Sequence, residues 1–417
     1  MSAPFRTYLR RLIRRGRLEV ETADGVTETF GDGVGPRLAV KVLDRAAEWR
    51  LMFNPALSLG ELYMDGRLVV TSGGLYDLLE LGARNLAEIE GLPWVKALNK
   101  IRIALRALHQ RNDRRRAKRN VAAHYDHDVR LYELFLDSDL QYSCAYFQYP
   151  GQLLDDAQTA KKRHIAAKLL PKDGATALDI GCGFGGMALY LAGVAGAKVT
   201  GVTLSEEQFA LASERARQAG LADRVEFRLQ DYRDVEETFD RIVSVGMFEH
   251  VGVNRYDEYF AAAHRQLKDD GVMLLHFIGR NSLPGATNPF IRKYIFPGGY
   301  IPSLSEVLPA VERAGLYVTD IEILRLHYAD TLRAWRERFM ARRDEVARLY
   351  DDRFCRMWEF YLAGSETSFR VDGHMVCQLQ LAKRNDVVPL TRDYIAEREA
   401  ELRGREATRP SVRHAAE

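Results

Sequence analysis

The chain has 417 residues, of which 47% are hydrophobic and 28% charged, so the material for a sizeable apolar core is present. A formal net charge of +2 argues against a protein that binds polyanions over its whole surface. A length of this order predicts two or three domains.

Cysteine usage and hydropathy bear on the compartment. The four cysteines include no C-x-x-C pair, which argues against a disulfide framework, and we predict no metal site. No apolar run approaches the ~20 residues that a membrane span needs. The Arg-rich N-terminus lacks the apolar core of a signal peptide, so we expect a cytoplasmic protein.

The first segment, residues 1–18, predicts a basic amphipathic helix. It contains six arginines and no acidic residue, and Phe5 and Leu9 recur at helical spacing between the arginines. Such a helix can lie on an anionic membrane, remain solvated, or pack on its own domain, and the pattern leaves these alternatives open. Residues 19–85 then mix short alternating runs with turn signals, which predicts a small α+β domain.

A basic stretch follows between Lys96 and Arg119. It holds ten Lys or Arg residues and one acid, Asp113. A run of this kind can bind anionic lipid head groups or nucleic acid, or form a solvated linker. Because it lacks interleaved aromatic residues, we favour lipid or an acidic partner surface and expect no nucleic-acid partner.

The rest of the chain alternates apolar runs with helical patterns, which predicts a parallel sheet covered by helices on both faces. The fold class is therefore α/β, with a Rossmann-like seven-stranded sheet and a smaller N-terminal α+β domain. The predicted strands are Ala175–Gly181, Lys198–Leu204, Val225–Gln230, Phe239–Phe248, Gly271–Ile278, Leu316–Leu324 and an antiparallel Met375–Leu381. The intervening helical patterns are Ser205–Ala219, Tyr256–Leu267 and Leu304–Ala314, with an inserted helical pair at Thr331–Ala347 and Asp351–Leu362.

These patterns suggest four parts of the chain. We expect an N-terminal lipid-engaging domain over residues 1–95 and a basic linker over residues 96–119. A catalytic domain over residues 120–385 and a charged C-terminal tail over residues 386–417 complete the chain. We expect the tail to form a surface helix followed by a poorly ordered terminus.

The stretch from Leu178 to Gly186 reads as the end of a strand, a glycine turn and the start of a helix. Asp179, Gly181 and Gly183 follow a D-x-G-x-G-x-G spacing, which differs by one residue from the dinucleotide fingerprint. Glycines in such a turn let the backbone approach a ligand closely. The spacing resembles the first motif of Rossmann-like S-adenosylmethionine-dependent methyltransferases.

In a parallel sheet, ligands bind at the carboxyl ends of the strands. The second predicted strand ends in Thr203 rather than the acid that holds ribose hydroxyls in typical nucleoside sites. Two titratable residues, Glu249 and His276, end central strands and can converge for acid–base work. The alternative is that Glu249 only orients the cofactor and His276 only packs in the core. A lone Cys such as Cys144 is most often a small core residue.

Taken together, the motifs resemble the cyclopropane-fatty-acyl-phospholipid synthase family over nearly the whole chain, and Thr203 in place of an acid fits that family. The matching stretches are GELYMDG (Gly60–Gly66), HYD (His124–Asp126), QYSCAYF (Gln141–Phe147), LDIGCGFGG (Leu178–Gly186), VTLSEEQ (Val202–Gln208), QDYRD (Gln230–Asp234), FDRIVSVGMFEHVG (Phe239–Gly252), LLHFIG (Leu274–Gly279), KYIFPGG (Lys293–Gly299) and Y-x-x-T-L (Tyr328–Leu332).

The resemblance implies a methyl transfer from S-adenosylmethionine to the cis double bond of a membrane phospholipid acyl chain. A carbocation then loses a proton to bound bicarbonate, and a cyclopropane ring closes. The bicarbonate residues implied by matching motif are Cys144, Glu249, His276, Ile278 (through its backbone) and Tyr328. The cofactor residues implied are Tyr125, Asp179, Gly181, Gly183, Thr203, Leu204, Gln208, Gln230 and Asp231.

Because its substrate sits in a membrane, such an enzyme would dock peripherally on the inner face. A related lipid methyltransferase that yields a methyl-branched or methylene product is the main alternative. A catalytically dead lipid-binding protein is disfavoured because all five anion-site residues are present. A nucleic-acid methyltransferase is disfavoured because Met247-Phe248-Glu249-His250 stands where an N-P-P-[YF] type motif is expected. The sequence leaves a homodimer open.

Overall fold

The computed structural model describes residues 1–85, 93–104 and 128–408. Its contacts divide the chain into two compact units, each of which is assembled from three separate segments. Unit 1 comprises Met1–His109, Gly285–Pro297 and Leu332–Gly373. Unit 2 comprises Gln110–Pro284, Gly298–Thr331 and His374–Glu417.

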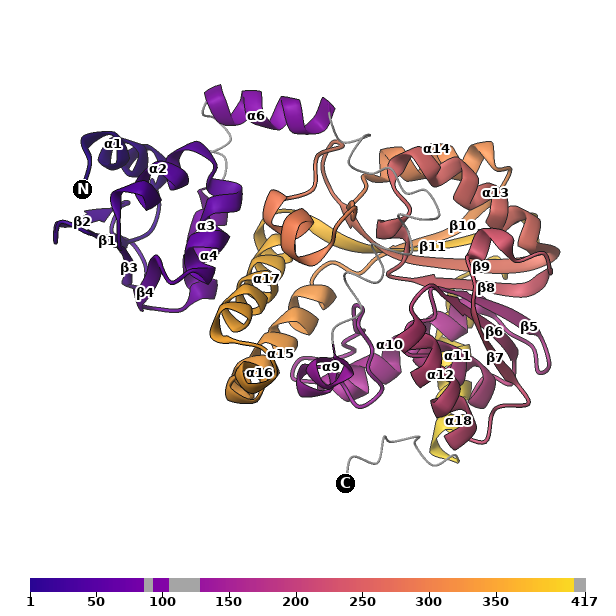
Figure 1. The fold of residues 1–417 in the computed structure, drawn as a ribbon. Helices are drawn as coiled ribbons and strands as arrows, with labels where there is room; N and C mark the ends of the chain where they lie inside the picture. Colours follow the sequence, from indigo (N-terminus) through magenta and orange to yellow (C-terminus); the bar gives the residue numbers. More distant parts are fainter. Residues whose placement is uncertain (86–92, 105–127, 409–417) are drawn as a thin grey trace. The chain divides into compact units, whose positions relative to one another are not determined.

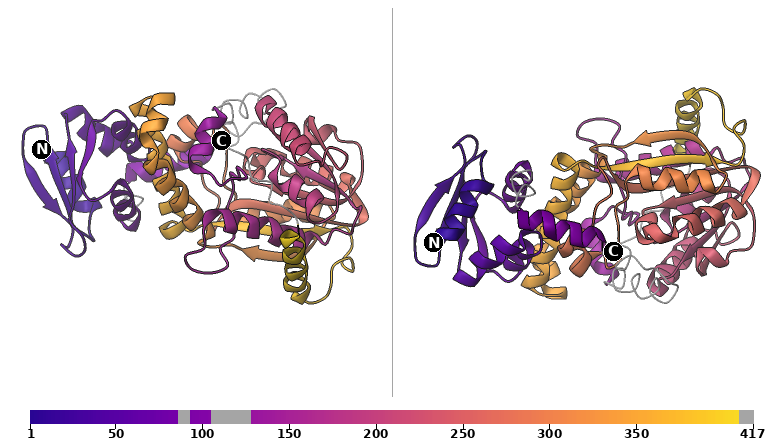
Figure 2. Two further views of the ribbon diagram at one scale, coloured as in Figure 1. Left: turned by 90° about the horizontal axis from the view of Figure 1, so that it is seen from below. Right: turned by 90° about the horizontal axis from the view of Figure 1, so that it is seen from above.

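Unit 1 contains a sheet that appears in indigo in Figure 2. It has four strands in the order β2-β1-β3-β4, in which only the β1–β3 pair is parallel. This confirms the small α+β domain expected for residues 19–85. The strands are β1 (Leu18–Thr22), β2 (Thr27–Phe30), β3 (Leu38–Val42) and β4 (Leu68–Ser72). The helices of the N-terminal segment are α1 (Ala3–Leu12), α2 (Arg45–Phe53), α3 (Pro55–Met64), α4 (Leu75–Arg84) and α6 (Pro93–Ala104).

Helix α1 uses its apolar face inside its own unit. Phe5 and Leu9 are buried in the core beneath the sheet. On the polar face, the guanidinium groups of Arg6 and Arg10 both donate to the Glu28 carboxylate at 2.6 Å. Of the three alternatives for this helix, the structure therefore supports packing on its own domain, and insertion of its apolar face into a membrane is excluded while the unit is folded.

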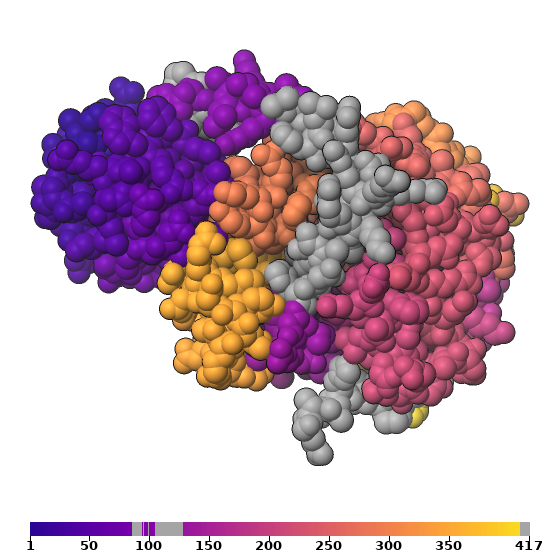
Figure 3. All heavy atoms as spheres, viewed as in Figure 1, coloured from indigo at the N-terminus to yellow at the C-terminus, as the bar shows by residue number. Residues whose placement is uncertain are grey.

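The later segments complete unit 1. They supply α16 (Arg343–Leu349), α17 (Asp352–Val371) and most of α15 (His327–Ala341). Helix α17 packs on α3 and α4, and the gold segment in Figure 3 lies against the indigo N-terminal residues. Three helices thus stand where the sequence predicts an inserted pair, and they group with the N-terminal segment rather than with the methyltransferase sheet. The amphipathic pattern predicted the helices but carried no information about which core covers them.

Unit 2 is built on a seven-stranded sheet in the order β10-β11-β9-β8-β5-β6-β7 (Figure 1). Only β11 runs antiparallel to its neighbours, as the sequence predicted for its last strand. The strands are β5 (Thr176–Ile180), β6 (Lys198–Thr203), β7 (Val225–Leu229), β8 (Phe239–Val245), β9 (Leu267–Arg280), β10 (Tyr317–Ile323) and β11 (His374–Ala382). The predicted α/β class with a Rossmann-like sheet is confirmed.

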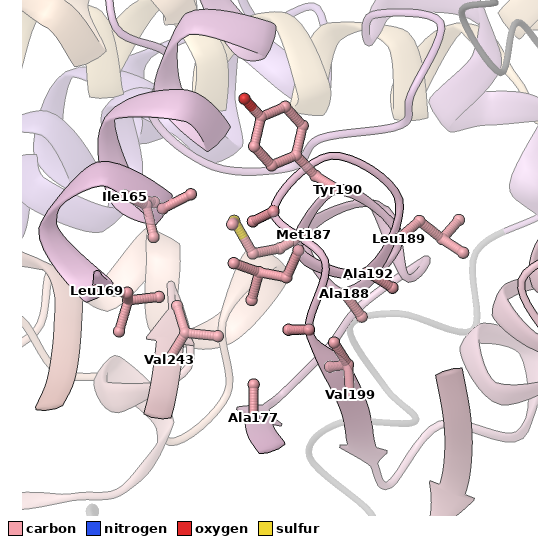
Figure 4. Packing of buried hydrophobic residues seen from close by; sticks show 14 of the residues in the cluster. Ile165, Leu169, Ala177, Met187, Ala188, Leu189, Tyr190, Ala192, Val199 and Val243 are labelled. Atoms are coloured by element: carbon pink, nitrogen blue, oxygen red, sulfur yellow. The ribbon is translucent and has the colours of Figure 1, made fainter. Parts of the chain in front are cut away.

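Helices cover both faces of this sheet, and each face has its own apolar cluster. One face carries α10 (Leu154–Leu169), α11 (Gly186–Gly193), α12 (Glu206–Gln218) and α18 (Asp393–Ala407). The other carries α13 (Tyr256–Gln266) and α14 (Leu304–Arg313). On the first face, Ile165 and Leu169 of α10 lie beside Met187 of α11 over Val243 (Figure 4).

Helix α10 is unusual because its charged side chains are buried. Lys161, His164 and Lys168 all lie in the interior, where lysine rarely occurs without a partner. Helix α10 lies between the sheet and α18, whose Tyr394, Ile395 and Leu402 are buried in the same cluster. The segment expected as a charged tail therefore includes a packed helix, while residues 409–417 lie outside the described residues.

Two further observations concern the described part of the chain. No helix there is long and apolar enough to cross a membrane. All four cysteines are buried and carry free thiols.

Candidate active site

The glycine turn links the end of β5 to the start of α11. Gly181 and Gly183 both have positive φ, at 78° and 53°, a region that non-glycine residues rarely adopt. A Cβ atom at Gly181 would meet the Met247 side chain at 2.7 Å, whereas one at Gly183 would meet nothing within 4 Å. The backbone at Gly183 is thus open to close approach, which is what a nucleoside ligand at this turn requires.

Asp179, the acid of this motif, is buried at the end of β5. Its Oδ2 atom has no hydrogen-bond partner among the described residues. Burial raises the pKa of Asp179 to about 7, although the charge of Lys161 and a backbone hydrogen bond from Ala188 act to lower it. An under-satisfied buried carboxyl beside a glycine turn fits a site that receives a polar ligand.

The ends of β6 and β7 carry the other expected cofactor residues. Thr203 donates through Oγ1 to Oε1 of Gln208 at 2.8 Å, and Leu204 lies between them in the chain. The backbone amide of Gln230 donates to the backbone carbonyl of Thr203 at 3.1 Å. Asp231 forms an ion pair with Arg233 and caps the short helix that follows β7.

The structure therefore brings these residues to one edge of the sheet. They lie at the carboxyl ends of the neighbouring parallel strands β5, β6 and β7, where the sequence pattern predicted them. Tyr125 lies outside the described residues, and its expected contact with the cofactor remains a prediction.

Two of the expected anion-site residues are joined directly. The backbone amide of Ile278 on β9 donates to Oε1 of Glu249 at 2.6 Å. The other carboxylate oxygen, Oε2, is buried without a hydrogen-bond partner among the described residues. Burial raises the pKa of Glu249 to about 7, although the Ile278 hydrogen bond acts to lower it. The carboxyl group thus exchanges its proton near neutral pH.

His276 lies two residues before Ile278 on the same strand and is 2% exposed. Its Nδ1 atom lies 3.2 Å from Nε2 of Gln378. Burial lowers the pKa of His276 far below its usual range, and the charges of Lys161, Lys168 and His164 add to this effect. The imidazole is therefore neutral at physiological pH.

Cys144 and Tyr328 come from different segments that the structure brings together. The Ala145 amide donates to Thr331 Oγ1 at 3.0 Å, and the Phe147 amide donates to His327 Nδ1 at 2.9 Å. These bonds join the start of α15, which carries the buried Tyr328, to the irregular segment around Cys144. Burial raises the pKa of the Cys144 thiol, so the sulfur keeps its proton.

Lys161 is a candidate functional residue that the sequence analysis missed. Its ammonium group donates to Oε1 of Gln141 and to Oγ of Ser143, which lie just before Cys144 in the chain. Burial lowers the pKa of Lys161 to about 8, although Asp137 opposes the shift. Spacing gives one signal for such a residue: Lys161, His164 and Lys168 follow at intervals of three and four, so they share one face of α10.

Comparison with known proteins places the chain among lipid-modifying methyltransferases. A family model described as mycolic acid cyclopropane synthetase matches residues 112–379. The cyclopropane-fatty-acyl-phospholipid synthase of Escherichia coli strain K12 is 41% identical over 323 residues, which cover 77% of this chain and 81% of that protein. The tuberculostearic acid methyltransferase UfaA1 of Mycobacterium tuberculosis is 36% identical over 378 residues, covering 87% of each chain.

A solved structure extends the comparison to the fold and the cofactor. The mycolic acid cyclopropane synthase CmaA1, complexed with SAH and CTAB, superimposes with a TM-score of 0.60 at 34% sequence identity. The match covers 63% of this chain and 97% of that one.

Proposed function

The chain belongs to the mycolic acid cyclopropane synthetase family, and from this premise we propose that it cyclopropanates unsaturated phospholipid acyl chains. In the proposed reaction a methyl group passes from S-adenosylmethionine to a cis double bond, and a proton is lost as the ring closes. The observation that carries the proposal is the buried pairing of Glu249 with the Ile278 amide, two residues from a neutral His276. This arrangement supports an anion-dependent deprotonation beside the cofactor turn.

The glycine turn fits the cofactor, because the backbone at Gly183 is open and the buried Asp179 has an oxygen without a described partner. When bound, S-adenosylmethionine supplies an electrophilic methyl group. The chain would hold it along the carboxyl edge of β5, β6 and β7, with Thr203 and Gln208 at the edge of β6. Alignment and exclusion of water are what this chemistry most needs from a protein, since the sulfonium is already reactive.

Five residues would form the site for bicarbonate, which supplies a base near the acyl chain. The neutral His276 can donate one hydrogen bond, and a tyrosine hydroxyl such as that of Tyr328 can do the same. The Cys144 thiol donates to the Ala145 carbonyl at 3.2 Å and would turn its S–H bond to donate to the anion. The Ile278 amide holds Glu249, so we propose that Ile278 acts by orienting that carboxyl. Burial of Glu249 and His276 keeps water away from the developing cation.

A lipid analysis tests the reaction. Expression in a bacterial host that lacks its own cyclopropane synthase should convert unsaturated phospholipid acyl chains to cyclopropane chains, measured by gas chromatography with mass spectrometry. The His276→Asn variant, at equal expression, should give no such conversion. Methyl-branched or methylene chains instead would establish the alternative product, and an unchanged lipid profile would contradict both.

Access to phospholipid requires contact with a membrane, and unit 1 offers a suitable surface. A hollow of about 520 Å³ is lined by Trp49, Phe53 and Trp94 together with α1 residues that include Arg11. The three aromatic side chains are 46%, 63% and 42% exposed, and the rings of Trp49 and Phe53 stack 5.8 Å apart. Exposed aromatic residues beside arginines are typical of membrane-interface contacts. We propose that unit 1 docks peripherally through this hollow.

The docking proposal predicts a measurable loss of vesicle binding. Replacing Trp49 and Phe53 with alanine should weaken binding to anionic phospholipid vesicles by about tenfold or more, since a large apolar side chain contributes roughly 1.5–3 kcal/mol on leaving water. Sedimentation with vesicles measures this. Val34→Ala is the matched control, because Val34 is 72% exposed but does not line the hollow. Equal binding by the double variant and the control would contradict the proposal.

A further inference from the structure

A row of polar side chains crosses three strands of the methyltransferase sheet next to His276. His276 on β9 stands directly opposite Gln378 on β11, and Gln378 stands directly opposite Glu322 on β10. Residues directly opposite each other in a sheet share one face. The row faces α10, because Lys168 of that helix contacts both Gln378 and Glu322.

The contacts along this row have a fixed direction. The Lys168 ammonium donates to Oε1 of Gln378 at 2.8 Å and also to the Glu322 carboxylate. An ammonium group has three donors and no acceptor, so the amide oxygen of Gln378 must face Lys168. The amide nitrogen then faces the other way, toward His276 Nδ1 at 3.2 Å. Because this nitrogen can only donate, Nδ1 must accept, and the single proton of a neutral imidazole must sit on Nε2.

We propose that Gln378, held by Lys168, fixes His276 as the Nε2–H tautomer and is thereby a positioning residue for the reaction. The inference rests on the proposed function only in the last step, where Nε2–H donates to the anion. His276 in this form can donate a hydrogen bond from Nε2 and has no lone pair there with which to take a proton. The row thus assigns His276 to binding the base rather than to acting as the base.

The outer end of the row is tied to α18. The His164 ring lies between two carboxylates, with Nε2 2.7 Å from Glu322 and Nδ1 2.6 Å from Glu399. Burial raises the pKa of Glu322, but the hydrogen bonds and charges of His164 and Lys168 hold it well below its usual range. Glu322 is therefore a stable acceptor for Lys168, which keeps the ammonium in place to orient the Gln378 amide.

The tautomer can be observed directly by nitrogen-15 NMR of the full-length protein labelled at histidine, with the His276 signals assigned from their loss in His276→Asn. We expect a protonated Nε2 and an unprotonated Nδ1 in the unmodified chain. A protonated Nδ1 would overturn the proposal without any variant. In Gln378→Glu the new carboxylate can only accept, so Nδ1 should become protonated, and an unchanged spectrum would also overturn it.

Gln380→Glu is the matched control. Gln380 lies two residues along β11 and is equally buried, but its amide donates to the Lys168 carbonyl and the Tyr394 hydroxyl instead. The His276 signals of the Gln380→Glu variant should match those of the unmodified chain. Turnover should fall in Gln378→Glu by at least about tenfold relative to this control, and by up to the ~10⁴-fold that a wrong histidine tautomer costs elsewhere. A shifted tautomer with full activity would confirm that Gln378 sets the tautomer, but it would refute both its role as a positioning residue for the reaction and the anion-binding role of His276.

Discussion

Replacing Glu249 with glutamine is expected to lower turnover by about 10²–10⁴-fold while leaving the fold intact. A glutamine oxygen can still accept the Ile278 amide, so the local backbone is preserved. The group that exchanges a proton near neutral pH is lost, and positioned acid–base groups typically contribute this much to rate. Lipid turnover at saturating S-adenosylmethionine and bicarbonate measures the effect.

The same substitution has an independent signature in stability. Burial raises the pKa of Glu249 from 4.5 to about 7, so its contribution to stability is complete below pH 4.5 and is lost as the pH rises through 7. Glutamine does not titrate. In ligand-free protein, the variant should therefore gain about 3 kcal/mol relative to the unmodified chain between pH 4.5 and 7.

Denaturant unfolding across this pH range measures the difference. Asp179 titrates in the same window in both proteins, so its contribution cancels. Glu306→Gln serves as the control, since Glu306 also accepts a backbone amide, that of Ser303, but at the cap of α14. Parallel pH profiles for the unmodified chain and the Glu249 variant would contradict the burial argument, and retained turnover would contradict the site.

Replacing Lys161 with methionine is expected to raise the bicarbonate concentration needed for half-maximal activity by roughly thirtyfold or more. The charge of Lys161 acts to lower the pKa values of Cys144 and Asp179, so it reaches both the proposed anion site and the cofactor turn. A buried cation next to an anion site favours occupancy by the anion, and removing one charge from a buried pair typically costs 2–5 kcal/mol. Methionine retains the length of the side chain without the charge.

Activity measured against added bicarbonate, after carbon dioxide is removed from the buffer, tests this expectation. Lys162→Met is the matched control, because Lys162 is the next residue on α10 but pairs with Asp139. Both variants lose a largely buried ammonium, so a general loss of stability affects both. An unchanged bicarbonate requirement in Lys161→Met would show that this charge does not act on the anion.

Local patterns in the sequence predicted the sheet and its cofactor edge. The glycine turn at Gly181 and Gly183 is encoded within a few residues, and its positive φ angles are what glycine permits. The anion-site residues lie far apart in the chain, so only the family resemblance selected Cys144 and Tyr328 among many similar residues. Their convergence depends on how α15 meets the segment around Cys144, and that contact has no local signature.

The row of polar side chains that faces α10 could not be predicted from the sequence, for a different reason. Charged residues in a helix normally indicate a solvated face, and the KKRH run contains no signal that another helix covers it. The run is buried because α18 packs against α10, far along the chain from it. One pattern did indicate buried polar contacts. Gln378 and Gln380 interrupt an otherwise apolar strand, and polar side chains buried there need hydrogen-bond partners.

The three-segment composition of unit 1 has a consequence for synthesis. Leu75 and Leu79 of α4 are covered by Ala363 of α17, which the ribosome adds much later. At about 5–20 residues per second, the nascent chain waits on the order of 15 to 60 seconds before α17 emerges. During that interval every strand of the unit 2 sheet except β11 is also made. The apolar side of α4 therefore stays uncovered while most of the methyltransferase sheet is synthesised, and the chain of unit 1 is complete only at Gly373, just before the last segment of unit 2.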